Sequence, residues 1–166
     1  MVTAVVLEAV NEQINNELVS SYTYLAMSAH CSAQNFHGFA KWLRIQSAEE
    51  YDHAMKLLDF LINRGGGVRL NAIPEPKVKF KSMQEVFEVA LKQEQDVSKR
   101  IDALYETAQK EKAFSLMVEL QWFLTEQVEE EKQSRDIVAK FQLIKNDAVA
   151  LLEMDRELGS RGPEKK

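Results

Sequence analysis

Four long segments of this chain each carry an apolar stripe that is interrupted near its middle by side chains able to bind a metal. Every step along a stripe is three or four residues, which is the spacing of one helix face. A carboxylate on a buried face is unfavourable unless it is paired or bound to a metal. Four helices that place such groups at matching depth predict a metal site inside a four-helix bundle. The stripes are Leu7, Val10, Ile14, Glu17, Ser21 and Leu25; Phe39, Leu43, Gln46, Glu50, His53, Leu57 and Phe60; Phe87, Ala90, Glu94, Val97, Ile101 and Leu104; and Leu120, Phe123, Gln127, Glu130, Ser134, Ile137 and Phe141.

Length and composition fit one all-α domain. The chain has 166 residues, of which 45% are hydrophobic and 28% are charged, as in ordinary globular proteins. It contains only three prolines and six glycines, and alternating strand patterns are scarce. We expect a helical domain over residues 1–158, followed by a disordered tail over residues 159–166.

The same features disfavour several compartments and partners. Cys31 is the only cysteine, so no intrachain disulfide can form, which fits a reducing compartment. The first residues do not resemble a signal peptide, and no apolar run approaches the length of a membrane span. The net charge of −5 argues against a nucleic-acid-binding surface. We therefore expect a cytoplasmic protein without nucleic-acid or membrane partners.

Breaks in the helical pattern predict the topology. Short breaks should make the first and second helices antiparallel, and likewise the third and fourth. The connection over residues 65–81 can span about 55 Å when extended, whereas a helix of about 25 residues is about 38 Å long. This connection can therefore cross the whole bundle before Ser82 caps the third helix, with Glu85 completing a capping box. Helices are expected over residues 3–33, 39–63, 82–110 and 113–145. Either Asn146 or Asp147 could cap a short fifth helix that ends near Leu158.

The interrupted stripes predict two adjoining metal positions. Glu50 and His53 form an E-x-x-H motif, whose spacing lets both side chains bind one ion. Glu17, from the partner helix, would complete this first position. Glu94 and Glu130 would supply the second, and Glu50 could bridge the two ions with its two oxygens. A carboxylate-rich set with one histidine suits Fe or Mn rather than a thiolate zinc site.

Other side chains near these ligands allow two interpretations. Tyr24 follows Glu17 by seven residues on one face, so it is either a core tyrosine or a hydrogen-bond or one-electron donor beside the metals. Gln127 is neutral, so we expect it to donate a hydrogen bond there or to contact dioxygen weakly. Three flanking acids are either a solvated acidic face or, together with Glu130, a third cation site. These flanking acids are Glu49, Glu126 and Glu129.

At these residues the chain resembles the non-haem ferritins of bacteria and archaea, and the similarity covers nearly its full length. The resemblance implies a ferroxidase centre and assembly of twenty-four subunits into a hollow shell that stores ferric mineral. The motifs that carry it are Asn11-Glu12-Gln13-Ile14-Asn15 with Glu17, Tyr24-Leu25, Glu49-Glu50 with His53-Ala54-Met55, Arg64-Gly65-Gly66, Ala72-Ile73-Pro74, Phe87-Glu88, Lys92 with Glu94, and Gln121-Trp122-Phe123 with Glu126-Gln127-Val128-Glu129-Glu130-Glu131. The implied iron ligands are Glu17, Glu50 and His53 at the first site, Glu50, Glu94 and Glu130 at the second, and Glu49, Glu126, Glu129 and Glu130 at a third.

Two departures from the haem-binding relatives of this family argue against structural haem. Those relatives carry a methionine directly after the Glu of the motif, where this chain has Tyr51. They also have Glu and His where this chain has Gln127 and Glu130. We therefore expect iron as the bound metal and no haem.

The leading hypothesis is an iron-storing ferroxidase that oxidises Fe(II) with O₂ or peroxide and deposits Fe(III) mineral in a shell. The alternative is a di-iron redox enzyme, a peroxidase or a hydroxylase, which uses the same inner ligands without storage. A purely structural bundle does not account for an interior Glu on each of four helices.

Overall fold

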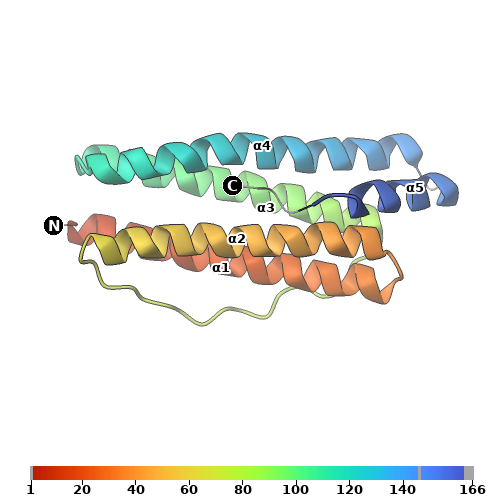
Figure 1. Cartoon of the computed structure of the whole chain (residues 1–166), viewed down its shortest axis with the longest axis horizontal. Helices are drawn as coiled ribbons and strands as arrows, with labels where there is room; N and C mark the ends of the chain where they lie inside the picture. The colour runs from red at the N-terminus through yellow and green to blue at the C-terminus, as the bar shows by residue number, and fades with distance from the viewer. Residues whose placement is uncertain (1, 146, 163–166) are drawn as a thin grey trace.

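Four long helices form an antiparallel bundle, and a shorter fifth helix lies against one end of it (Figure 1). The structure is a computed structural model, and it describes residues 2–145 and 147–162. All regular structure in these ranges is helical, which confirms the all-α bundle with one long crossover connection. The helices are α1 (Ala4–Ala33), α2 (His37–Asn63), α3 (Met83–Lys110), α4 (Phe114–Ile144) and α5 (Ala148–Gly159).

Polar side chains define where three of the helices begin. The hydroxyl of Thr3 accepts the Val6 backbone N–H at 3.3 Å at the start of α1. Ser82 caps α3 by accepting the N–H of Glu85 at 3.1 Å, as predicted. The Glu85 carboxylate accepts the backbone N–H of Lys81 rather than that of Ser82. The expected capping box therefore closes one residue before the N-cap. Asp147 caps α5, as the sequence allowed.

The connection between α2 and α3 runs the length of the bundle beside α1 and α2 (Figure 1). Two asparagine side chains of α1 hold it there through their amides. Asn11 donates to the Gly67 carbonyl at 2.9 Å and accepts the Arg69 N–H at 2.7 Å. Asn15, one turn later, donates to the Arg69 carbonyl and accepts the Asn71 N–H. These bonds satisfy the backbone of a segment that has no helix or strand partner of its own.

The apolar core consists of two clusters, one toward each end of the bundle, and the polar interior residues lie between them. The predicted stripes of the third and fourth helices are buried throughout. The first stripe is wrong at its end, because Leu25 is 38% exposed whereas Tyr24 is fully buried. With 3.6 residues per turn, Tyr24 lies about 20° from Glu17 around the helix, and Leu25 about 80°. Cys31 is buried in the core, and burial raises the pKa of its thiol to about 12.

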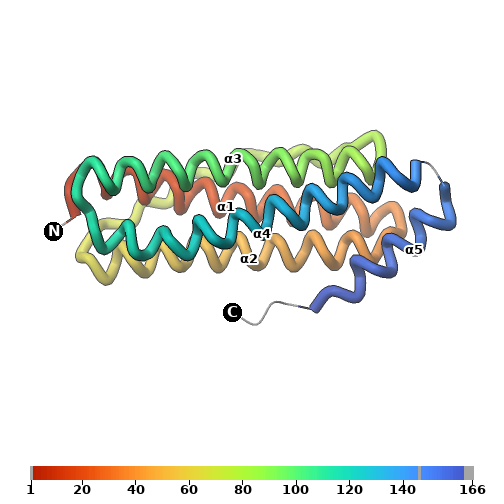
Figure 2. Tube along the Cα trace, turned by 90° about the horizontal axis from the view of Figure 1, so that it is seen from above, coloured from red at the N-terminus to blue at the C-terminus, as the bar shows by residue number. Residues whose placement is uncertain are grey.

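Helix α5 turns back along the bundle and docks on the first turn of α2 (Figure 2). A Cβ at Gly38 would lie 1.7 Å from the Asp155 carbonyl oxygen, so only glycine permits this approach. The Asp155 carboxylate accepts the Phe39 N–H at 2.8 Å and so caps α2, which has no cap of its own. Lys41 donates to the Gly159 carbonyl at 2.8 Å. The C-terminal half of α5 is thereby fixed on α2.

Two expectations from the sequence bear on the rest of the chain. The described part of the tail, residues 160–162, includes Arg161, whose guanidinium contacts α2. Residues 163–166 lie outside the described residues, so the disordered tail stays a prediction. Across residues 2–145 and 147–162, no helix combines the length and apolarity that a bilayer crossing requires.

Candidate metal centre

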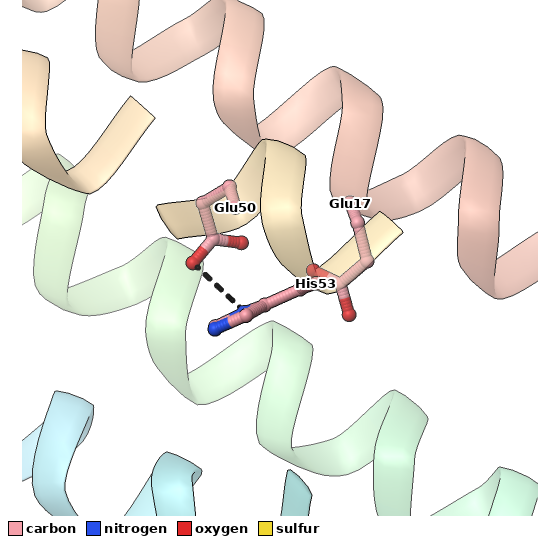
Figure 3. A group of neighbouring side chains, drawn as sticks. All are labelled: Glu17, Glu50 and His53. Carbon is pink, nitrogen blue, oxygen red and sulfur yellow. Dashed lines mark ion pairs between the residues drawn. The ribbon is translucent and has the colours of Figure 1, made fainter. Parts of the chain in front are cut away.

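Glu17, Glu50 and His53 converge in the middle of the bundle (Figure 3). Glu17 comes from α1, and the other two side chains come from successive turns of α2. Each offers a ligand atom, and these atoms lie within 4.8 Å of one another. The Nδ1 atom of His53 lies 3.6 Å from Oε1 of Glu50. Exposed fractions of 0%, 0% and 1% show that water does not solvate this group. The E-x-x-H motif therefore forms the compact cluster that its spacing predicted.

Glu94 of α3 and Glu130 of α4 are also buried, at 0% and 2% exposure. The Tyr24 hydroxyl donates a hydrogen bond to Oε1 of Glu94. Gln127 donates to Oε2 of Glu94 at 3.2 Å, so it forms a hydrogen bond to an expected ligand, one of the two contacts expected of it. Gln46 donates to Oε2 of Glu130 at 2.8 Å. All four interior carboxylates are therefore in place, one from each helix of the bundle.

Glu50 differs from the other three carboxylates because no amide or hydroxyl donor of the described residues reaches it. Gln13 donates to Glu17 at 2.7 Å, as Gln46 and Gln127 do to their own carboxylates. Among the described residues, neither oxygen of Glu50 has a hydrogen-bond partner. Oε2 of Glu17 has none either. A fully buried carboxylate without donors is strongly unfavourable unless a proton or a cation neutralises it.

The pKa values show how strongly this space disfavours negative charge. Burial, followed by the charges of Glu94 and Glu17, raises the pKa of Glu50 well above its usual range. Burial raises the pKa of Glu94 to about 7, despite the hydrogen bonds from Tyr24 and Gln127. Burial raises the pKa of Glu17 as well.

The same causes act on the remaining side chains of the centre. Burial, followed by the charge of Glu94, raises the pKa of Glu130 to about 8. Burial and the charge of Glu94 also raise the pKa of Tyr24, which keeps its hydroxyl protonated. Without a cation, the centre therefore holds protons at neutral pH. Cations of total charge comparable to that of the carboxylates would displace these protons and supply the missing contacts of Glu50.

Aromatic rings fix the orientation of His53. The Trp122 ring lies edge-on at 5.3 Å from the imidazole, and the Phe123 ring lies at 5.8 Å. Both aromatic residues belong to α4, across the bundle from His53. An imidazole held in one rotamer is better prepared to bind an ion than a mobile one. The sequence motifs included Trp122 without assigning it this contact.

The flanking acids are not equivalent in the structure. Glu49 is buried and forms an ion pair with Arg161 at 2.9 Å. Glu126 is half-buried, and Glu129 is exposed. In the part of the chain that the structure describes, the inner cluster of Glu17, Glu50 and His53 is the only group of three or more acid, His or Cys side chains with ligand atoms this close. The second and third iron sites therefore stay predictions.

Three polar residues of the centre had no role in the sequence interpretation. Gln13 precedes Glu17 by four residues, so helix spacing alone places its amide within reach. Gln46 was placed on the inner stripe, but its partner Glu130 is on another helix. Arg161 is more than one hundred residues from its partners, and no local pattern indicates its contact.

The fold and the buried carboxylate–histidine cluster define a four-helix-bundle protein whose interior has side chains that could hold a metal ion. A family profile described as Ferritin-like domain matches residues 7–144. The chain is 38% identical over 161 residues to the bacterial non-heme ferritin of Staphylococcus haemolyticus (strain JCSC1435), covering 97% of each chain. It is 36% identical to the bacterial non-heme ferritin of Staphylococcus aureus (strain USA300), with the same coverage. This chain belongs to the ferritin family.

Solved structures agree with this assignment. The fold matches an open pore ferritin from the hyperthermophilic archaeon Archaeoglobus fulgidus with a TM-score of 0.96 and 43% sequence identity. The match covers 98% of this chain and 100% of that one. An engineered closed form of the Archaeoglobus fulgidus ferritin matches equally well, over 99% of this chain. The resemblance found in the sequence motifs is confirmed.

Proposed function

We propose that this protein stores iron and that its interior is a ferroxidase centre. The observation that carries the proposal is the state of Glu50, a fully buried carboxylate to which no described amide or hydroxyl donates, beside Glu17 and His53. A cation between these three side chains would remove an otherwise unfavourable charge arrangement. The carboxylate-rich donor set suits iron. The relatives named non-heme ferritins support iron as the substrate.

In the proposed reaction, Fe(II) enters two adjoining positions. Glu17, Glu50 and His53 hold the first ion, and Glu50, Glu94 and Glu130 hold the second. Each ion gives up one electron, and O₂ takes the two electrons with two protons to form hydrogen peroxide. When peroxide is the oxidant, it takes two electrons and two protons and yields two waters. The chain contributes the positioning of two ions at one shared carboxylate.

Two further side chains control the surroundings of the second position. Tyr24 donates to Glu94 and so orients the carboxylate that would bind the ion. Because burial raises the pKa of Tyr24, its hydroxyl stays protonated and is the donor of this hydrogen bond. Gln127 holds the other oxygen of the same carboxylate. Losing either donor should leave Glu94 less well oriented, which would slow oxidation without removing a ligand.

Storage requires that Fe(III) leaves the centre and that many chains enclose a cavity. We propose that Glu49, Glu126 and Glu129, together with Glu130, form a third iron site on this path. A groove of about 760 Å³ on the outer side of α1 and α2 supports contact with further copies of the chain. Leu25, in that groove, and Tyr22 and Tyr51, on the same two helices, are 38%, 46% and 50% exposed. A homo-oligomeric shell of twenty-four subunits in the cytoplasm, without haem, completes the proposal.

Aerobic loading with Fe(II), followed by sizing and iron counting, tests this function. We expect particles of about twenty-four times the 19.0 kDa chain mass that retain far more iron than three ions per chain. A shell with a mineral core is the only arrangement in the proposal that can hold such an excess. A monomer or dimer that oxidises Fe(II) but retains at most two or three ions per chain would favour the di-iron redox enzyme instead.

A further inference from the structure

The guanidinium of Arg161 lies at the edge of the metal centre. One of its nitrogens, Nη1, donates to the side-chain oxygen of Gln46. The other, Nη2, donates to the two oxygens of Glu49 at 2.9 and 3.3 Å. The side chain is only 14% exposed, and its guanidinium lies 5.1 Å from the centre of the Trp42 ring. Arginine with two hydrogen-bonded partners and an aromatic contact is an ordered element of the structure.

Through Gln46, this contact reaches an expected iron ligand. A guanidinium can only donate hydrogen bonds, so the amide oxygen of Gln46 must face Arg161. The amide nitrogen then faces the other way, and it donates to Glu130 at 2.8 Å. Arg161 therefore determines which end of the Gln46 amide the Glu130 carboxylate contacts. Its charge also opposes the rise in the pKa of Glu130 that burial causes.

The docking of α5 delivers Arg161 to this place. The close contact at Gly38 and the cap from Asp155 fix α5 on α2. Lys41 fixes the carbonyl of Gly159, two residues before the arginine. Figure 1 shows that α5 runs back from the end of the bundle, and Arg161, two residues after it, contacts Gln46 and Glu49 of α2. The distance between Gly159 and the centre is thus bridged by a short, anchored segment.

We propose that Arg161 is a positioning residue whose guanidinium stays paired with the Glu49 carboxylate until an iron ion displaces it. The end of the chain would thereby regulate the third iron site. This inference rests on the proposed function, and it concerns regulation of the same centre. An ion bound to Glu49 would lie within a few ångströms of the guanidinium, where two positive charges repel each other strongly. The two cations therefore exclude one another. By linkage, an ion at the third site should also release the chain end from α2.

Zinc titration of metal-free protein provides a test that does not depend on iron oxidation. In a Trp122→Phe background, Trp42 is the only tryptophan, and its ring contacts the Arg161 guanidinium. We expect the third zinc equivalent per chain, and not the first two, to change Trp42 fluorescence. Arg161→Gln should remove that change and tighten binding of the third equivalent about tenfold, within the usual range of coupling between two sites.

Three further variants separate this role from general effects of charge and folding. Arg156→Gln removes an exposed arginine of α5 that forms an ion pair with Glu153 of the same helix, and it should behave like the background protein. Glu49→Gln should abolish tight binding of the third equivalent. Arg161→Lys keeps the charge without the planar fork, so it should restore much of the competition.

The possible outcomes decide the inference independently of the proposed function. Unchanged or weaker binding of the third equivalent in Arg161→Gln would overturn it, and so would the absence of a third equivalent in every variant. Two tight zinc equivalents and rapid Fe(II) oxidation would still support the ferroxidase proposal in either case. Conversely, failure of the first two equivalents to bind to the protein that retains Trp122 would overturn the ferroxidase centre itself, because Trp122 contacts His53.

Discussion

Replacing Glu50 with Ala should lower the initial rate of Fe(II) oxidation by at least about a hundredfold, the scale on which loss of correct positioning slows catalysis. Glu50 is the one carboxylate expected to contact both ions, and neither of its oxygens accepts a hydrogen bond from a described residue. Its removal should therefore separate the two electron donors as well as weaken their binding. The measurement is stopped-flow oxidation at two Fe(II) per chain.

Comparison with the terminal ligands makes this prediction specific. Glu17→Ala and Glu94→Ala each remove a ligand of one ion only, so both should slow oxidation less than Glu50→Ala. The folded protein should persist in all three, because deleting one of several repelling buried carboxylates relieves an unfavourable arrangement. Glu106→Ala, at an exposed residue of α3, is the matched control and should be neutral. A Glu50→Ala rate close to that of the unsubstituted protein would contradict the dinuclear assignment.

The metal-free protein should become less stable as the pH rises from about 5 to 8. Glu94 and Glu130 have folded-state pKa values of about 7 and 8, compared with 4.5 for an ordinary glutamate. Between these values, the folded state binds more protons than the unfolded state, so the free energy of unfolding falls as pH rises. The pKa shift of Glu94 alone corresponds to a loss of about 3 kcal/mol in the free energy of unfolding across this range. That loss is equivalent to roughly 10 °C in melting temperature.

Zinc should flatten or reverse this dependence, because the cations take the place of the protons and bind more tightly as those protons leave. Thermal unfolding of chelator-treated and zinc-loaded protein between pH 5.5 and 8.5 tests this. Other groups in an oligomer also titrate, so Glu94→Gln serves as the comparison, and its metal-free form should lose much of the slope. A metal-free protein whose stability rises steadily over this range would show that the interior carboxylates are already ionised.

The sequence predicted the bundle well because its signals are local. The cap at Ser82 and the alternative caps before α5 identified two helix starts to within a residue. The crossover followed from the length of the connection alone. The predicted stripe on α1 is wrong at Leu25. Four residues are slightly more than one helical turn, so two successive four-residue steps move the side chain off the buried face.

The inner cluster was predictable for the same local reason, since Glu50 and His53 lie one turn apart on one helix. Contacts between distant segments were not predictable. The amides of Asn11 and Asn15 bind a loop more than fifty residues away, and nothing in the helix periodicity distinguishes them from solvated side chains. The partner of Glu49 lies in a segment expected to be a disordered tail, and only the docking of α5 brings it there.

The most direct test of the central claim is the position of iron in crystals soaked anaerobically with Fe(II) and measured by anomalous scattering at the iron edge. The proposal predicts one iron between Glu17, Glu50 and His53, and a second between Glu50, Glu94 and Glu130, with Glu50 bridging both. Iron found only on surface carboxylates, with the interior cluster unchanged from the arrangement in Figure 3, would contradict it.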